Sequence, residues 1–104
     1  MLKKNLKHIA LPQNKIADFC RRYRVRRMAL FGSVLRDDFT PNSDVDVLVE
    51  FEEGVQIGLF GFARMEAELS RLLGRKVALH TPGFLSPYFR DEVMREAEVV
   101  YEQA

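Results

Sequence analysis

Two aspartates separated by one residue, Asp44 and Asp46, follow a polar loop and open an apolar segment. Alternate residues of a strand project from the same face, so both carboxylates share a small volume while Val45, Val47 and Val49 face the presumed core. Like charges this close repel each other unless a cation lies between them. Mg²⁺ prefers oxygen ligands and completes its shell with waters and substrate phosphates. The pair therefore predicts half of a magnesium-nucleotide site, with two solvated aspartates at a strand end as the alternative.

A candidate phosphate-binding turn precedes the aspartates. Gly32 and Ser33 follow a compact apolar run, at a point where a short helix can begin. The first backbone amides of a helix have no helical carbonyl to bond, so they favour an anion. Glycine lets a bulky phosphate approach the backbone, and the serine hydroxyl adds a donor. A Gly-Ser turn alone is usually a simple cap, but the aspartate pair that follows it favours a phosphate cradle.

Apolar periodicity and turn formers predict the elements that must position these residues. We expect helices and strands to alternate, with polar turns between them and the candidate site at the strand ends. The helices are expected at 12–24, briefly after Ser33, at 59–73, and after Ser86-Pro87 with Phe89, Val93, Ala97 and Val100 on one face. The strands are expected at 25–31, 44–51 and 76–80. The order predicts an α/β fold with about three strands flanked by helices, in a single domain over residues 1–104.

The composition agrees with an ordinary globular domain. Of the 104 residues, 47% are hydrophobic and 30% are charged, which excludes a disordered or collagenous chain. No apolar run approaches the roughly 18 residues of a membrane span, and the N-terminus has no secretory signal pattern. We therefore expect a cytoplasmic protein without a membrane partner. A single cysteine, Cys20, excludes an internal disulfide and a multi-cysteine zinc site, and it is expected to be a buried core thiol.

Charge is unevenly distributed along the chain, although the formal net charge is only +1. Basic residues crowd the first quarter: Lys3, Lys4, Lys7, Lys15, Arg21, Arg22, Arg24, Arg26 and Arg27. Acidic residues dominate the end: Asp91, Glu92, Glu96, Glu98 and Glu102. This pattern suits docking to a charged partner, and solvated helix faces without a partner explain it equally well. Direct nucleic-acid binding through the basic leader is a minor alternative and is not expected.

Gly32-Ser33, ten intervening residues and Asp44-Val45-Asp46 resemble the GSx10DxD signature of the DNA polymerase beta-like nucleotidyltransferase superfamily. The segments LFGSVLRDDFTPNSDVDVLVEF, LLGRKV and LSPYFRDEVMREAEVVYE resemble its minimal nucleotidyltransferase (MNT) branch, so the resemblance covers nearly everything after about residue 15. It implies the nucleotidyltransferase fold, with a small mixed sheet. It also implies Mg²⁺-dependent transfer of a nucleotidyl group from a nucleoside triphosphate to a hydroxyl, with pyrophosphate leaving.

The resemblance assigns roles to the motif residues. The paired aspartates would hold magnesium between the α-phosphate and the departing phosphates. We expect Ser43 to steady the loop before them, and Arg36 either to reach phosphate or to brace Asp37 or Asp44. The predicted nucleotide-binding residues are Gly32, Ser33, Arg36 and Ser43, and the predicted catalytic and metal-binding residues are Asp44 and Asp46.

One position departs from the family pattern. The superfamily adds a third carboxylate from a following strand, and this branch is expected to read GRKVDL where this chain reads GRKVAL, with Ala78 at the carboxylate position. A methyl group neither binds metal nor accepts a proton, and a positioned base contributes about 10² to 10⁴ in rate. His80, two residues further on the same face, is a minor candidate for a substitute base. The resemblance thus implies an impaired or inactive enzyme.

The MNT branch also implies a partner. Its members are often encoded beside HEPN-domain proteins as toxin-antitoxin pairs, which implies an antitoxin that adenylylates (AMPylates) a tyrosine of a HEPN RNase toxin with ATP and Mg²⁺. A hetero-oligomer with the toxin would follow, and neutralisation by binding alone is the alternative that Ala78 leaves open. A set of aromatic residues is expected to form core or partner contacts rather than to stack on a base: Phe60, Phe62, Tyr88, Phe89 and Tyr101.

Overall fold

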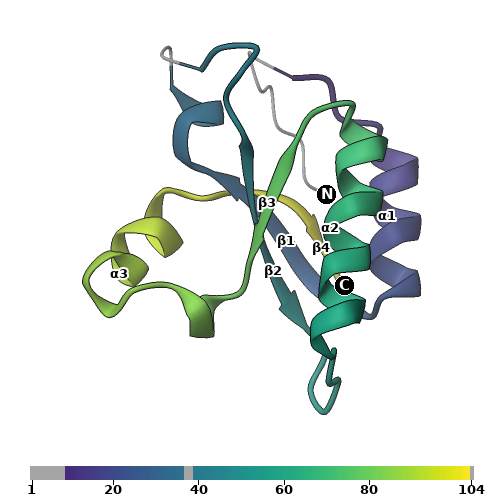
Figure 1. Ribbon diagram of the computed structural model, residues 1–104. Coiled ribbons are helices and arrows are strands. Elements are labelled where there is room, and N and C mark those ends of the chain that lie inside the picture. The colour runs from purple at the N-terminus through teal and green to yellow at the C-terminus, as the bar shows by residue number, and fades with distance from the viewer. Residues whose placement is uncertain (1–8, 37–38, 104) are drawn as a thin grey trace.

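The computed structural model describes residues 9–36 and 39–103, which form an α/β fold around one mixed sheet (Figure 1). The α-helices are α1 (Gln13–Arg22), α2 (Leu59–Leu73) and α3 (Pro87–Glu96), and two short 3₁₀ helices are η1 (Gly32–Leu35) and η2 (Pro82–Phe84). The strands are β1 (Val25–Phe31), β2 (Val45–Phe51), β3 (Val77–His80) and β4 (Glu98–Glu102). The predicted α/β class is confirmed, and the short helix after β1 is a 3₁₀ turn.

The sheet has the strand order β3-β2-β1-β4. β1 runs antiparallel to both β2 and β4, whereas β2 and β3 are parallel neighbours. The antiparallel register places Phe31 opposite Asp46, and the parallel register places Asp46 beside Ala78. One row across three strands therefore carries Phe31 at the end of β1, Asp46 on β2 and Ala78 on β3. Ala78 is the position where the family pattern has its third carboxylate.

The core lies between the sheet and the two helices α1 and α2, which cover the same face (Figure 1). Val45, Val47 and Val49 alternate along β2 and are fully buried, as the strand periodicity predicts. Cys20 on α1 is buried, and burial raises the pKa of its thiol to about 12, which confirms a core thiol rather than a reactive one.

The end of the chain differs from its prediction. The last helix was expected to carry Ala97 and Val100, but α3 ends at Glu96, and residues 98–102 form β4, the fourth strand of the sheet. β4 pairs with the edge of β1 that would otherwise expose its backbone amides and carbonyls, and Val100 fills the core from there. Backbone pairing with a distant strand outweighs the local helical spacing, because the segment is rich in β-branched valine.

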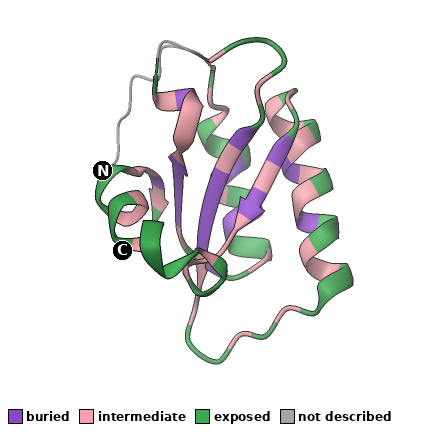
Figure 2. Cartoon of the chain, turned by 60° about the vertical axis from the view of Figure 1, so that its left-hand side comes forward, coloured by how far each residue is buried: buried purple, intermediate pink, exposed green. Residues whose placement is uncertain are grey.

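α3 stands on the side of the sheet opposite to α1 and α2 (Figure 1), and every one of its residues is at least partly exposed (Figure 2). The sequence left core or partner contacts open for the aromatic residues. Phe60, Tyr88 and Phe89 are exposed, so these three are not core residues. Phe62 and Tyr101 pack against the core. Within the described part of the chain, no helix has the length and apolar character needed to cross a membrane.

Candidate active site

The predicted phosphate-binding turn and one predicted metal-binding aspartate lie in direct contact. Gly32 follows β1 directly and is the first residue of η1, with a positive φ of 79°. A Cβ atom added at this position would lie 3.3 Å from Cγ of Asp46 and closer still to its Oδ2. Only glycine fits here, because a side chain would strain the backbone and displace the carboxylate. The Gly-Ser turn and Asp46, fourteen positions apart, thus form one site.

Asp46 has a second neighbour across the sheet. Its carboxylate Oδ1 lies 3.4 Å from Nε2 of His80, and both side chains are about one-third exposed. The His80 ring contacts the Phe31 ring edge to face, with ring centroids 5.2 Å apart. Ala78 lies beside Asp46 in the β2-β3 register and presents a methyl group to it. The sequence indicated that His80 and Ala78 share a face, but not that His80 reaches Asp46.

Asp44 lies one residue before β2 and is exposed. The backbone amide of Val45, between the two aspartates, donates to the carbonyl of Lys76 at 2.8 Å. This bond holds the start of β2 against the start of β3, so the extended chain carries both aspartates at the same end of the sheet. Access to solvent suits a metal ligand that must also accept a substrate phosphate.

The loop before the aspartates is held by a cation that sequence reasoning missed. One Arg75 nitrogen, Nη2, donates to the carbonyls of Thr40 at 2.7 Å and Ser43 at 3.4 Å, and its guanidinium stacks over Phe39. Ser43 Oγ also accepts a hydrogen bond from the Thr40 amide at 3.0 Å. The predicted steadying role of Ser43 agrees with these bonds, while nucleotide binding by Ser43 stays a prediction. Nothing but its place after a helix terminator marked Arg75 in the sequence.

Arg36 is exposed directly after η1, and its backbone amide donates to the Ser33 carbonyl at 2.9 Å. Its side chain is therefore carried on the turn that contains Gly32 and Ser33. The predicted bracing of Asp37 lies outside the described residues, as do Lys3, Lys4 and Lys7 of the basic leader.

β3 carries Ala78 and His80 at an edge of the sheet, and α2 holds it there. Glu66 accepts a hydrogen bond from the Leu79 amide at 2.8 Å, and Ser70 Oγ accepts one from the Val77 amide at 3.0 Å. Side chains thus bond the backbone amides that face away from β2. Glu66 was not singled out from the sequence, where it belongs only to an amphipathic helix pattern.

The donor set fits a magnesium ion that is held partly by substrate. Among residues 9–36 and 39–103, no three His, Cys, Asp or Glu side chains form a group that could hold a metal ion by themselves. Mg²⁺ in nucleotide sites is commonly bound by one or two carboxylates plus phosphate oxygens and waters. The Asp46 carboxylate against the glycine turn, with the Asp44 carboxylate directly before the same strand, supplies this smaller set.

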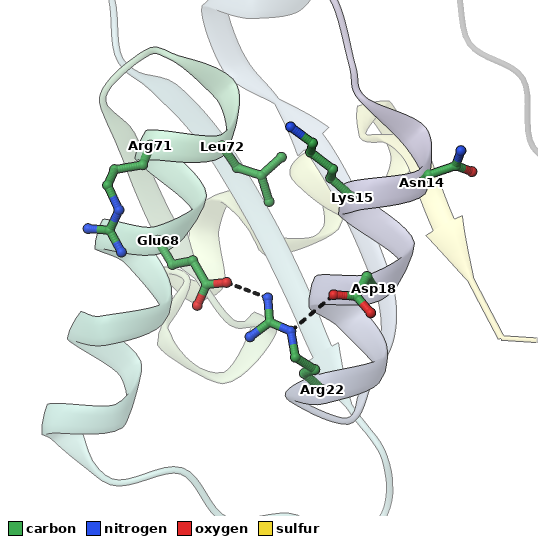
Figure 3. Close-up of a pocket in the computed structure, with 7 residues that line it drawn as sticks. All are labelled: Asn14, Lys15, Asp18, Arg22, Glu68, Arg71 and Leu72. Atoms are coloured by element: carbon green, nitrogen blue, oxygen red, sulfur yellow. Dashed lines mark hydrogen bonds and ion pairs between the residues drawn. The ribbon is translucent and has the colours of Figure 1, made fainter.

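A separate pocket lies between α1 and α2 (Figure 3). It has a volume of about 640 Å³ and contains none of the predicted site residues. Arg22 lines it and donates hydrogen bonds to both Asp18 and Glu68, and the Tyr23 hydroxyl donates to Glu68 at 2.8 Å. The Arg22 guanidinium lowers the pKa of Glu68. The Arg22 guanidinium is thus paired with carboxylates of both helices, and its ion pair with Glu68 links α1 to α2.

The model of the nucleotidyltransferase domain family matches residues 13–100. The chain belongs to this family. The protein adenylyltransferase MntA of Thermococcus cleftensis is 40% identical over 80 residues, covering 77% of both chains. A solved structure of a "putative minimal nucleotidyltransferase" is 38% identical, with a TM-score of 0.67, covering 82% of this chain and 85% of the other. Together these findings confirm the resemblance to the minimal nucleotidyltransferase branch.

Two further solved structures share the nucleotidyltransferase fold. One is a toxin-antitoxin with AMP-PNP, with a TM-score of 0.72 at 21% identity, covering 89% of this chain and 75% of the other. The second is an MNT antitoxin in complex with a tri-AMPylated HEPN toxin of Shewanella oneidensis, with a TM-score of 0.63 at 19% identity, covering 88% and 70%. At these identities the likeness establishes the fold.

Proposed function

We propose that this nucleotidyltransferase domain is the antitoxin of a HEPN/MNT toxin-antitoxin pair, acting in the cytoplasm as a single domain over residues 1–104. Its site is built for Mg²⁺-dependent adenylyl transfer from ATP to a hydroxyl, a tyrosine of the HEPN RNase toxin. The observation that carries the proposal is the contact between the Gly32 turn and the Asp46 carboxylate. It joins a phosphate-binding element to a metal-binding one.

In the proposed reaction, the toxin hydroxyl oxygen bonds to the α-phosphorus of ATP. The bond from that phosphorus to the bridging oxygen breaks, pyrophosphate leaves with the electron pair, and the hydroxyl proton is released to solvent. Gly32 and Ser33 would bind the departing phosphates, and Asp44 and Asp46 would hold Mg²⁺. The ion, when bound, neutralises phosphate charge during the transfer. The chain's main contribution is to hold the reactants in line.

Ala78 leaves the hydroxyl proton without its acceptor. It lies beside Asp46 in the β2-β3 register, at the position where the family pattern has a carboxylate that would help to hold the metal and accept the hydroxyl proton. Losing a positioned base costs about 10² to 10⁴ in rate. We therefore propose that this chain binds ATP and Mg²⁺ but transfers adenylyl groups slowly or not at all.

Two findings support the choice of partner. A relative 40% identical is named a protein adenylyltransferase, and a fold neighbour was solved as an antitoxin bound to an AMPylated HEPN toxin. The chain itself exposes the large apolar side chains of Phe60, Phe84 and Tyr88, each more than four-fifths accessible. The exposure of Phe60 and Tyr88 agrees with the sequence-based alternative of partner contacts.

The test is to restore the carboxylate. The Ala78→Asp variant, mixed with labelled ATP, Mg²⁺ and the HEPN toxin encoded beside it, is expected to label the toxin about 10² to 10⁴ times faster than the present chain. Ala78→Asn is the matched control, since it has nearly the same size without charge or basicity, and it is expected to give no gain. Absence of labelling by Ala78→Asp contradicts the proposed chemistry.

Ala78 also favours a second candidate function, which is neutralisation of the toxin by binding alone. Under this alternative, the double variant Asp44→Ala with Asp46→Ala retains full neutralisation in a toxin growth-rescue assay. Loss of rescue by the double variant, with complex formation intact, favours the transferase.

A further inference from the structure

His80 is the neighbour that Asp46 has in place of a third carboxylate. Ala78 lies directly beside Asp46 in the sheet and has no polar group to offer it. His80 projects from the same face of β3, two residues on, and its Nε2 lies 3.4 Å from Oδ1 of Asp46. An ionised carboxylate only accepts hydrogen bonds, so a hydrogen bond between the two requires the imidazole N–H as donor.

The imidazole also contacts the other half of the site. Phe31 belongs to β1 and His80 to β3, and these strands lie on opposite sides of β2. Their rings nevertheless meet at 5.2 Å between centroids with an interplanar angle of 61°, so the His80 ring lies across the face of β2. Phe31 immediately precedes Gly32. The His80 side chain therefore packs next to the glycine turn and also faces Asp46.

The two oxygens of Asp46 have different surroundings. Oδ1 is the oxygen near His80, and Oδ2 is the oxygen nearest to the space that a Cβ at Gly32 would occupy. A donor on Oδ1 therefore restricts rotation of the carboxylate and keeps Oδ2 at the turn.

We propose that His80 is a positioning residue: its Nε2–H holds Oδ1 of Asp46, so that Oδ2 faces the Gly32 turn where a metal-bound phosphate would lie. The inference rests on the proposed function, because it assigns His80 to the same metal-nucleotide site. His80 thereby orients the metal ligand Asp46, a role that the methyl group of Ala78 cannot fill. It does not replace the missing base.

Two substitutions separate the hydrogen bond from the aromatic packing. His80→Gln keeps an N–H donor at a similar reach and removes the ring, whereas His80→Phe keeps a ring against Phe31 and removes the donor. Binding of Mn²⁺ with ATP, measured by electron paramagnetic resonance on the full chain at one fixed pH, reports the site without requiring transfer. Thermal unfolding of each variant shows that the comparison is made between folded proteins.

We expect His80→Phe to weaken Mn²⁺-ATP binding by about tenfold and His80→Gln to stay within about twofold, since groups that orient metal ligands typically contribute 10- to 100-fold in affinity. The reverse order, or no change in either variant, overturns the proposal and leaves His80 a packing residue.

A double-mutant cycle tests whether His80 acts through Asp46. In an Asp46→Asn background, His80→Phe is expected to have no further effect on Mn²⁺-ATP binding. A full additional loss overturns the positioning role. If Asp46→Asn binds as tightly as the present chain, the proposed function fails together with the inference. If Asp46→Asn weakens binding and His80→Phe does not, the inference fails alone.

Discussion

The two faces of the sheet differ in what covers them. On one face, α1 and α2 pack against the sheet and bury Phe19, Met65 and the three valines of β2 almost completely. On the other face, Asp46 and His80 remain about one-third exposed, and α3 contributes no fully buried residue (Figure 2). The face under α1 and α2 holds the core cluster, whereas the other face leaves Asp46 and His80 accessible and so does not bury their polar groups unpaired.

The same strands serve both faces. Val45 and Val47 anchor β2 in the core, and Asp46 between them points the other way. A rigid strand is therefore the support of the aspartate, in contrast with a site carried by loops alone. Substitutions on the two faces should separate stability from ligand binding.

The largest effect is expected in the covered core. Phe19→Ala removes a fully buried ring and should lower the free energy of unfolding by about 3–5 kcal/mol, because a cavity is left behind. Urea denaturation measures this loss. Phe60→Ala, at a ring that is 86% exposed, is the matched control and should change the stability by less than about 0.5 kcal/mol. Equal losses in the two variants would contradict the assignment of the core.

A smaller effect on stability, but a large one on binding, is expected at the open face. Gly32→Ala and Gly54→Ala both place a side chain at positive φ, 79° and 85°, and each should cost roughly 1–2 kcal/mol. Only Gly32→Ala also displaces Asp46, since no atom lies within 4 Å of a Cβ at Gly54. Mn²⁺-ATP affinity should fall at least about tenfold in Gly32→Ala alone. A similar fall in Gly54→Ala would show that the strain, and not the carboxylate, is responsible.

The smallest effect is expected at the link between the two covering helices. The Arg22 guanidinium lowers the pKa of Glu68 below its ordinary value of 4.5. The stabilisation is therefore present above pH 4.5 and is lost as the pH falls through the folded-state value. Glu68→Gln should lower the unfolding free energy by less than about 1 kcal/mol at pH 7, because the pair is partly exposed. Urea denaturation at a series of pH values should show this difference vanish once the pH lies below the folded-state pKa of Glu68, where the carboxyl is protonated; a difference that persists under those acidic conditions would exclude the ion pair as its cause.

Much of this architecture could be predicted from local patterns. The alternation of valines along β2 and the amphipathic pattern of α2 are periodic within one element, and the glycine that opens η1 marks a turn, so local patterns indicate all three. β4 could not be predicted in this way. Residues 97–100 continue the helical spacing of α3, and only the presence of an unpaired β1 edge makes a strand the better solution.

The amino-acid sequence by itself determined which chemical groups are available, namely a glycine-serine turn, two carboxylates one residue apart and a methyl group where a third carboxylate is expected. It also determined the family, because the nucleotidyltransferase domain model matches residues 13–100 of the sequence. Only the tertiary structure decided that His80 reaches Asp46, that Arg75 holds the loop before it and that the chain ends as a strand. These contacts join residues more than thirty positions apart or depend on a distant strand, and their geometry follows from the pairing of β1, β2 and β3, which no local preference specifies.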